Sequence, residues 1–159
     1  MNESLKEIKP GYGLGDIKFG MTRDEVKAIL GEPDDIDAFS YTEDNENNTE
    51  TWLYDEMELT VGFDEEDDWR LVMITVASDF YTLNDKSLIG MNREKLVAQL
   101  KEMKIEDLVF EDISTEEEPN QVLVEVDSLS VNFWLDENHL DEIQWSPLFI
   151  DDDTIKWPE

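Results

Sequence analysis

The segment Gly20–Pro33 has the sequence Gly-Met-Thr-Arg-Asp-Glu-Val-Lys-Ala-Ile-Leu-Gly-Glu-Pro, which contains the start and end signals of a short helix. Thr22 is a good N-cap, and Glu25 stands three residues later, as in a capping box. The apolar residues that follow recur at the spacing of one helix face. Gly31 can adopt the positive φ that ends many helices, and Pro33 cannot continue one. The sequence therefore predicts one short, capped helix here.

A second copy of this segment begins at Gly90, where Asn92 takes the place of Thr22 as the N-cap. Each copy is followed by stretches rich in β-branched, aromatic and alternating apolar residues, as strands are. These stretches are 52–54, 57–63 and 71–76 in the first half, and 121–126, 129–133 and 140–145 in the second. The shared order of a helix and then strands predicts an internal repeat that spans most of the chain.

These elements predict an α+β fold built of two tandem helix–meander repeats. The strands would form one continuous antiparallel sheet, with both helices packed on one face. We expect a single globular domain, 1–159, in which the repeats span 16–80 and 86–146, with a flexible leader at 1–15 and a flexible tail at 147–159.

Alternation along the strands assigns their side chains to two faces of the sheet. The helix-covered face would include Trp52, Tyr54, Leu59, Val61, Phe63, Val72, Ile74, Val76, Val122, Val124, Val126, Leu129, Val131, Phe133, Ile143 and Trp145. The opposite face would include Leu53, Thr60, Leu71, Met73, Thr75, Leu123, Glu125, Asn132, Trp134, Glu142 and Gln144. Because Leu71, Met73 and Trp134 make this second face more apolar than a solvated surface, we expect it to be covered or to bind a partner. The polar segment 34–50 is expected to form a loop, with at most a short strand at 39–41.

A net charge of −30 sets this 159-residue chain apart, while its 40% apolar residues are enough for a folded core. Such a protein repels nucleic acid and anionic membranes and attracts basic proteins. Acidity that serves only solubility or salt adaptation is the alternative. The absence of cysteine excludes disulfides and thiolate metal sites. With no N-terminal signal pattern and no apolar run long enough to span a bilayer, we expect a cytoplasmic protein.

No arrangement of residues in the sequence predicts catalysis, so we expect a protein that is not an enzyme and needs no cofactor. His139 is the single histidine, and no Ser or Thr pairs with it at the spacing of a nucleophilic site. The acidic runs 64–68 and 151–153 do not provide a metal site. In the first run, Trp69 occupies the position at which a calcium loop requires glycine.

The pattern Ile17-x-Phe19-Gly20-Met21-Thr22-x-x-Glu25-Val26-x-x-x-Leu30-Gly31-x-Pro33, followed by an aromatic strand, resembles the opening motif of the SmpA/OmlA (BamE-like) proteins. Two such units in tandem are similar to the β-lactamase-inhibitor-protein (BLIP) fold. The resemblance implies a protein-binding module that uses the open face of its sheet. BamE-like proteins are exported lipoproteins and the secreted inhibitors have disulfides, whereas this sequence has no cysteine. Neither β-lactamase inhibition nor an outer-membrane role is therefore implied.

The distribution of charge favours a basic protein as the partner. No Lys or Arg occurs between Ala28 and Trp69, or between Ile105 and Ile155. We expect an intracellular inhibitor or immunity-type protein, monomeric or weakly dimeric, that docks a basic toxin or enzyme. The expected partner-binding residues are Leu53, Asp55, Glu56, Asp64, Glu65, Trp69, Leu71, Met73, Trp134, Asp136, Glu142 and Gln144. The alternatives are an enzyme or small-ligand module with a pocket between the sheet and the inserts, near His139 or Trp69, and a housekeeping or prophage scaffold protein.

Overall fold

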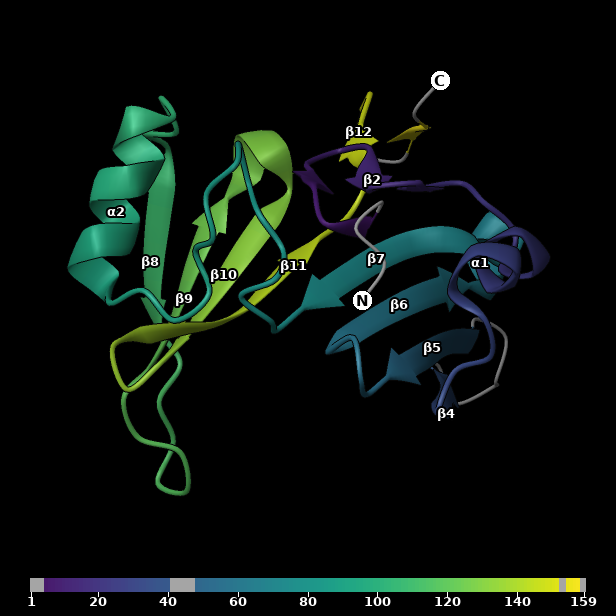
Figure 1. Cartoon of the computed structure of the whole chain (residues 1–159), viewed down its shortest axis with the longest axis horizontal. Helices are drawn as coiled ribbons and strands as arrows, with labels where there is room; N and C mark the ends of the chain where they lie inside the picture. The colour runs from purple at the N-terminus through teal and green to yellow at the C-terminus, as the bar shows by residue number, and fades with distance from the viewer. Residues whose placement is uncertain (1–4, 41–47, 152–153, 158–159) are drawn as a thin grey trace.

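A computed structural model describes residues 5–40, 48–151 and 154–157, and its main element is an eight-stranded antiparallel sheet (Figure 1). The strands lie in the order β4-β5-β6-β7-β11-β10-β9-β8. Their bounds are β4 Asp35–Ser40, β5 Asn48–Tyr54, β6 Leu59–Asp64, β7 Arg70–Val76, β8 Leu108–Asp112, β9 Gln121–Val126, β10 Val131–Asp136 and β11 His139–Trp145. Pairing of β7 with β11 joins the two halves of the chain, which leaves β4 and β8 as the edge strands.

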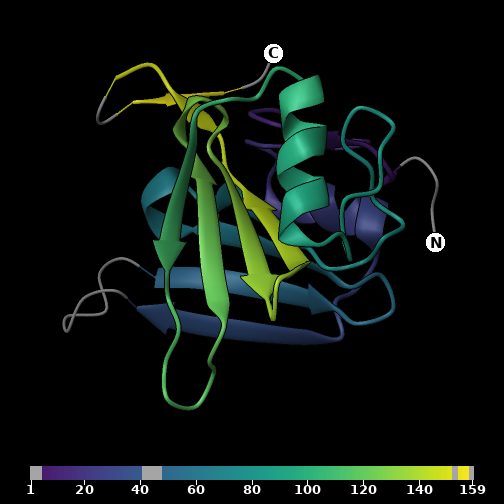
Figure 2. The ribbon, with the colours of Figure 1, turned by 90° about the vertical axis from the view of Figure 1, so that its left-hand side faces the viewer.

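The sheet is strongly twisted, so the strands of the second half cross those of the first at a steep angle (Figure 2). β-bulges interrupt the register between Gly62 and Phe63 and between Trp134 and Leu135. Bulges increase local twist and shift the following side chains relative to the partner strand. Short 3₁₀ turns, Glu65–Asp67 and Asp127–Leu129, connect strands within each half.

Two helices lie on the core face of the sheet, α1 at Arg23–Leu30 and α2 at Arg93–Glu102. The predicted cap of α1 is confirmed, since Thr22 Oγ1 accepts from the Glu25 amide at 3.2 Å and Glu25 Oε1 accepts from the Thr22 amide at 3.0 Å. Asn92 caps α2 with a single bond, in which its Oδ1 accepts from the Lys95 amide at 2.9 Å. The face of the sheet opposite α1 and α2 is called the open face below.

Replacing Thr22 with alanine removes the oxygen that caps α1, so the free energy of unfolding should fall by about 1 kcal/mol. Thr22→Ser keeps the oxygen and should stay close to the wild type in stability.

The hydrogen bond from the Thr22 amide lowers the pKa of Glu25 below its ordinary 4.5. The contribution of Glu25 is therefore present above that value and is lost as the pH falls through the lowered pKa. Chemical denaturation gives the free energy of unfolding of Thr22→Ala and Thr22→Ser. Equal values for the two variants would contradict the role of Thr22 as the cap.

The N-terminal segment is part of the core, and its prediction as a flexible leader is wrong for the residues described. β1 Ile8–Lys9, β2 Gly13–Leu14 and β3 Ile17–Lys18 form a separate three-stranded sheet. Leu5 and Leu14 are 2% and 0% exposed. The Trp145 indole donates to the Gly13 carbonyl at 3.0 Å, which ties this segment to the last strand of the large sheet.

The C-terminal segment forms a hairpin of β12 Leu148–Phe149 and β13 Ile155–Lys156, where the sequence predicts a flexible tail. Residues 1–4 of the predicted leader, and residues 152–153 and 158–159 of the predicted tail, lie outside the described residues. The segment 34–50 was also predicted to be mostly loop. Instead, β4 occupies 35–40 as an edge strand, and Tyr41 of the expected short strand lies outside the described residues.

The predicted fold class, α+β in two helix–meander repeats with a helical layer on one face, is wrong. In the described part of the chain α1 and α2 are only 8 and 10 residues long, so the protein is mostly β. Two short helices cannot cover eight strands. The β1–β2–β3 sheet and the segment 77–91, which inserts Tyr81, Leu83 and Leu88 into the core, complete the cover. Neither belongs to a helix–meander unit.

One residue predicted for the open face lies in the core because of a bulge. Phe63 pairs with Leu71 while Gly62 pairs with Met73, so Val72 is the extra residue. Leu71 is consequently buried, at 0% exposure, and Val72 is only partly buried. In the described chain, no helix has the length and apolar character needed to cross a membrane.

Candidate functional site

The open face has an acidic hollow around Trp134, here called the Trp134 pocket, with a volume of about 450 Å³. Strands β10 and β11, the turn between them and the end of the β8–β9 loop contribute its walls. The lining residues are Glu117, Glu118, Pro119, Gln121, Trp134, Asp136, Glu137, Asp141 and Glu142. Six of these nine side chains are carboxylates, and no Lys or Arg is among the described residues that line it.

Local pairing explains why these groups converge. The β-bulge pairs Trp134 with Glu142 and Leu135 with Leu140, so Asp141 is the extra residue and stands beside Glu142 at the rim. Glu137 has a φ of 49° and is followed by a second positive-φ residue, which is the geometry of a tight two-residue hairpin turn. The Glu137 amide donates to the Asn120 carbonyl at 3.0 Å. This bond attaches the protruding β8–β9 loop, visible in Figures 1 and 2, to the turn.

The Trp134 ring is held by one hydrogen bond and remains partly accessible to solvent. Its indole nitrogen donates to Gln144 Oε1 at 3.3 Å, and the side chain is only partly buried. An aromatic face beside carboxylates attracts ammonium and guanidinium groups through both the ring quadrupole and the charges. Burial, and next the charge of Asp141, raise the pKa of Glu142, which means that the surroundings disfavour its ionised form.

Glu142→Gln should raise the melting temperature by roughly 1–3 °C near pH 7, because the amide removes a charge that burial disfavours. This side chain is only partly buried, which keeps the effect small. A raised pKa in the folded state means that the native protein takes up the proton first as the pH falls. The difference between variant and wild type should therefore shrink as the pH falls through the raised pKa and below 4.5.

Thermal unfolding at several pH values tests this prediction. Glu117→Gln is the matched control, since Glu117 lines the same pocket but is exposed, and it should change the melting temperature little. Burial of the Glu142 charge would be contradicted if the melting temperatures of Glu142→Gln and wild type were equal at neutral pH, or if their difference did not shrink in acid.

A second hollow on the open face, the strap groove, has a volume of about 380 Å³ and lies between strands β5–β7 and the C-terminal hairpin. It is lined by Thr49, Thr51, Gly62, Asp64, Asp67, Val72, Met73, Gln144, Ser146, Pro147, Phe149 and Ile155. A Cβ at Gly62 would lie 3.0 Å from the Met73 methyl, so glycine here lets Met73 pack across the sheet. Burial, followed by the charges of Asp64, Glu66 and Asp68, raises the pKa of Asp67. Gln144 borders this groove and also bonds Trp134, so it connects the two hollows.

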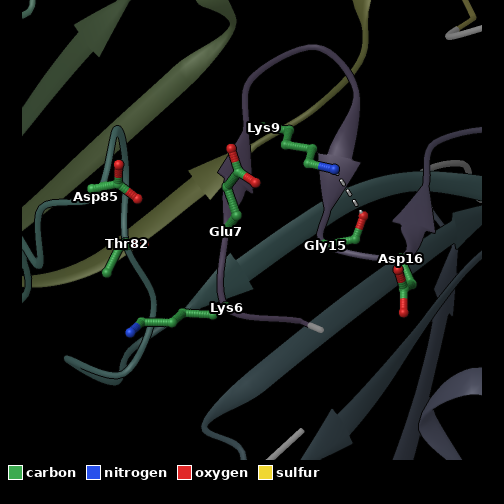
Figure 3. A pocket seen from close by; sticks show the side chains of 7 residues that line it. All are labelled: Lys6, Glu7, Lys9, Gly15, Asp16, Thr82 and Asp85. Atoms are coloured by element: carbon green, nitrogen blue, oxygen red, sulfur yellow. Dashed lines mark hydrogen bonds between the residues drawn. The ribbon is translucent and has the colours of Figure 1, made fainter. Parts of the chain in front are cut away.

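A third hollow, about 630 Å³, lies away from the open face between the N-terminal segment and the 82–85 turn (Figure 3). Its charged residues are Lys6, Glu7, Lys9, Asp16 and Asp85, and Lys9 Nζ donates to the Gly15 carbonyl at 3.3 Å. Figure 3 shows these side chains pointing in different directions rather than toward one point. This mixed arrangement provides no convergent set of groups for chemistry.

The structure brings together half of the sequence-predicted site residues and separates the others. Trp134, Asp136 and Glu142 line the Trp134 pocket, while Gln144, Met73 and Asp64 line the strap groove. Residues that lie elsewhere are Leu53 on the open side of β5, Asp55 and Glu56 in the exposed β5–β6 turn, and Glu65, which accepts from Asn48 Nδ2 at 3.2 Å.

Two predicted site residues face the core instead of the open face. Leu71 is buried by the bulge described above. Trp69 packs against the core, and the Arg23 guanidinium lies 4.5 Å from the centroid of its ring. Arg23 also forms an ion pair with Glu50 at 3.3 Å, so Trp69 belongs to the contact between α1 and the sheet.

Sequence reasoning missed most of the wall opposite Trp134, namely Glu117, Glu118, Pro119, Gln121, Glu137 and Asp141. The sequence nevertheless contains a signal that could have located part of this wall. The polar insert 111–120 leads directly into the strand that pairs with β10, so its end must lie next to the β10–β11 turn.

The described residues contain no group of three or more His, Asp and Glu side chains placed to hold a metal ion. His139 is exposed at the start of β11, with Nδ1 3.1 Å from the Glu137 carbonyl. Neither the His, Asp and Glu side chains of the described residues nor the position of His139 indicates a particular reaction.

No protein-family model and no curated protein matches the chain. Among solved structures, an extracellular protein containing an SCP domain from Bacillus anthracis str. Ames is similar, with 17% sequence identity and a TM-score of 0.49. The match covers 80% of this chain and 43% of that protein, so the chain spans less than half of its length.

Proposed function

We propose that this is a non-enzymatic binding protein that docks a basic protein partner on the open face of its sheet. The single observation that supports this most is the Trp134 pocket, where a partly exposed indole stands among six carboxylates. A lysine or arginine side chain from a partner would meet the ring and the charges together. Such anchors, seated in a pocket, dominate the energy of many protein interfaces.

The charge of the whole chain supports the same partner. Among the eight strands of the sheet, Arg70 is the one Lys or Arg. A net charge of −30 steers basic proteins toward this surface and repels acidic ones and nucleic acid.

Within this proposal, the protein acts as an inhibitor or immunity-type protein in the cytoplasm, and the basic partner is a toxin or an enzyme. An inhibitor of this kind needs no catalytic group of its own. It needs a surface whose charge complements the partner and an anchor that fixes the register, which the open face and Trp134 would supply.

The proposal is tested by capture from a lysate of the cells that encode the protein, followed by a salt titration of the purified pair. We expect a basic partner at one-to-one stoichiometry whose affinity falls at least about tenfold between low and high salt, because exposed charges are screened. An acidic partner, or an affinity that does not depend on salt, would overturn the proposal.

A further inference from the structure

Strand β8 is an edge of the large sheet, and one side of its backbone has no neighbouring strand within the described residues. The amide of Ile113, just after β8, donates to the Gln121 carbonyl at 3.0 Å. In this antiparallel register the amides of Val109 and Glu111 point to β9 as well, so the amide and carbonyl of Phe110 point outward from the sheet edge. Val109 and Phe110 are 52% and 41% exposed.

A groove of about 580 Å³ borders this edge on the core side, between β8 and α2. Val97 and Ala98 of α2 and the ring of Phe110 form its apolar floor. The Arg93 guanidinium lies 4.6 Å from the centroid of the Phe110 ring, and Lys101 stands on the same helix. The groove occupies the place where the inward side chains of a ninth strand would lie.

The two sides of this edge differ in charge. On the open side, Glu111 stands near the edge, and Val109 pairs with Glu125. On the groove side, Arg93, Glu94 and Lys101 border the apolar floor, so the charges there are mixed. An added strand would therefore place basic side chains on the open side and apolar ones in the groove.

We propose that β8 accepts an added strand from a basic protein, an extended segment that alternates Lys or Arg with apolar residues. Its backbone pairs with the outward groups of β8, its apolar side chains enter the α2 groove, and its basic side chains lie beside Glu111. A second copy of this chain is a poor occupant, because each copy has a net charge of −30. This edge is separate from the Trp134 pocket, so the inference stands or falls independently of the proposed function.

The probe is a blocked seven-residue peptide of alternating lysine and valine, titrated into the full chain by calorimetry. Two further peptides have N-methyl groups on all valine amides or on all lysine amides. In a strand, the amides of alternate residues point to the same edge, so one set faces β8 and the other faces solvent. We expect one methylated peptide to bind like the parent and the other to bind at least about tenfold more weakly.

Loss of binding with the valine-methylated peptide indicates an antiparallel added strand, and loss with the lysine-methylated peptide a parallel one. Both outcomes support strand addition. Equal binding of all three peptides would show attraction by charge alone and overturn the proposal, as would no binding of the parent peptide or self-association of the chain through this edge.

Variants of the protein provide the matching test. Phe110→Pro removes the outward amide donor at a position where an edge strand tolerates proline, and it should abolish peptide binding. Phe110→Ala keeps that amide and should retain weakened binding. Thermal unfolding checks that both variants are folded. If Phe110→Pro is folded and binds like the wild type, the proposal is wrong.

Discussion

Replacing Leu14 with alanine is expected to lower the free energy of unfolding by about 3 kcal/mol, within the range measured for fully buried leucines. Leu14 is 0% exposed and lies next to Gly13, whose carbonyl accepts the buried hydrogen bond from Trp145. The alanine variant would leave a cavity where the N-terminal sheet packs against the large sheet. Urea denaturation followed by circular dichroism measures the loss.

Tyr12→Ala is the matched control, because Tyr12 belongs to the same segment but is 38% exposed. It should change stability by less than about 1 kcal/mol. If Leu14→Ala were as mild as Tyr12→Ala, the N-terminal segment would be a flexible leader after all, and its assignment to the core would be wrong.

Replacing Trp134 with alanine is expected to weaken binding of the captured partner by about 30-fold, or about 2 kcal/mol, the effect of losing a hot-spot tryptophan. The ring provides the cation-binding face of the pocket, and no other aromatic side chain is among the described residues that line it. Trp134→Phe keeps an aromatic ring and should lose less affinity for the partner than Trp134→Ala. Calorimetric titration of both variants provides the comparison.

Because Trp134 is only partly buried, both variants should remain folded, which circular dichroism can check. Trp69→Phe is a control on the opposite side, where the ring packs under Arg23, and it should leave partner binding unchanged. If Trp134→Ala bound within about threefold of the wild type, Trp134 would not be an anchor.

Local signals in the sequence predicted the helix caps well, because they act within a few residues. Thr22, Glu25 and Asn92 bond as the capping pattern requires. Most residues assigned to the core face of the strands are buried, since alternation along a strand depends on the backbone alone.

Features that depend on distant contacts were not predictable in this way. The apolar residues of the N-terminal segment are too sparse to indicate a strand, and they are buried only because the large sheet provides a surface to cover. Leu71 was assigned to the wrong face because a single bulged residue, Val72, reverses the alternation before it. The α+β class failed because the cover of the sheet comes partly from β1–β3, which the sequence pattern did not show.

The candidate site was predictable in its centre and not in its walls. Trp134 and Glu142 stand out as an aromatic and an acidic residue on a face that alternation assigns to the outside. The opposing carboxylates at Glu117 and Glu118 come from a loop whose path is set by the Glu137–Asn120 hydrogen bond. The sequence could place the end of this loop next to the β10–β11 turn, because the loop leads into a strand that pairs with β10, but it could not show the bond itself.

Hydrogen–deuterium exchange of the protein with and without its captured partner tests the central claim most directly. If the partner docks on the open face, the amides of 131–145 and of the 117–121 segment should exchange more slowly in the complex, while those of α1 should not change. Protection confined to α1 and the N-terminal sheet, with no change in 131–145, would contradict the account.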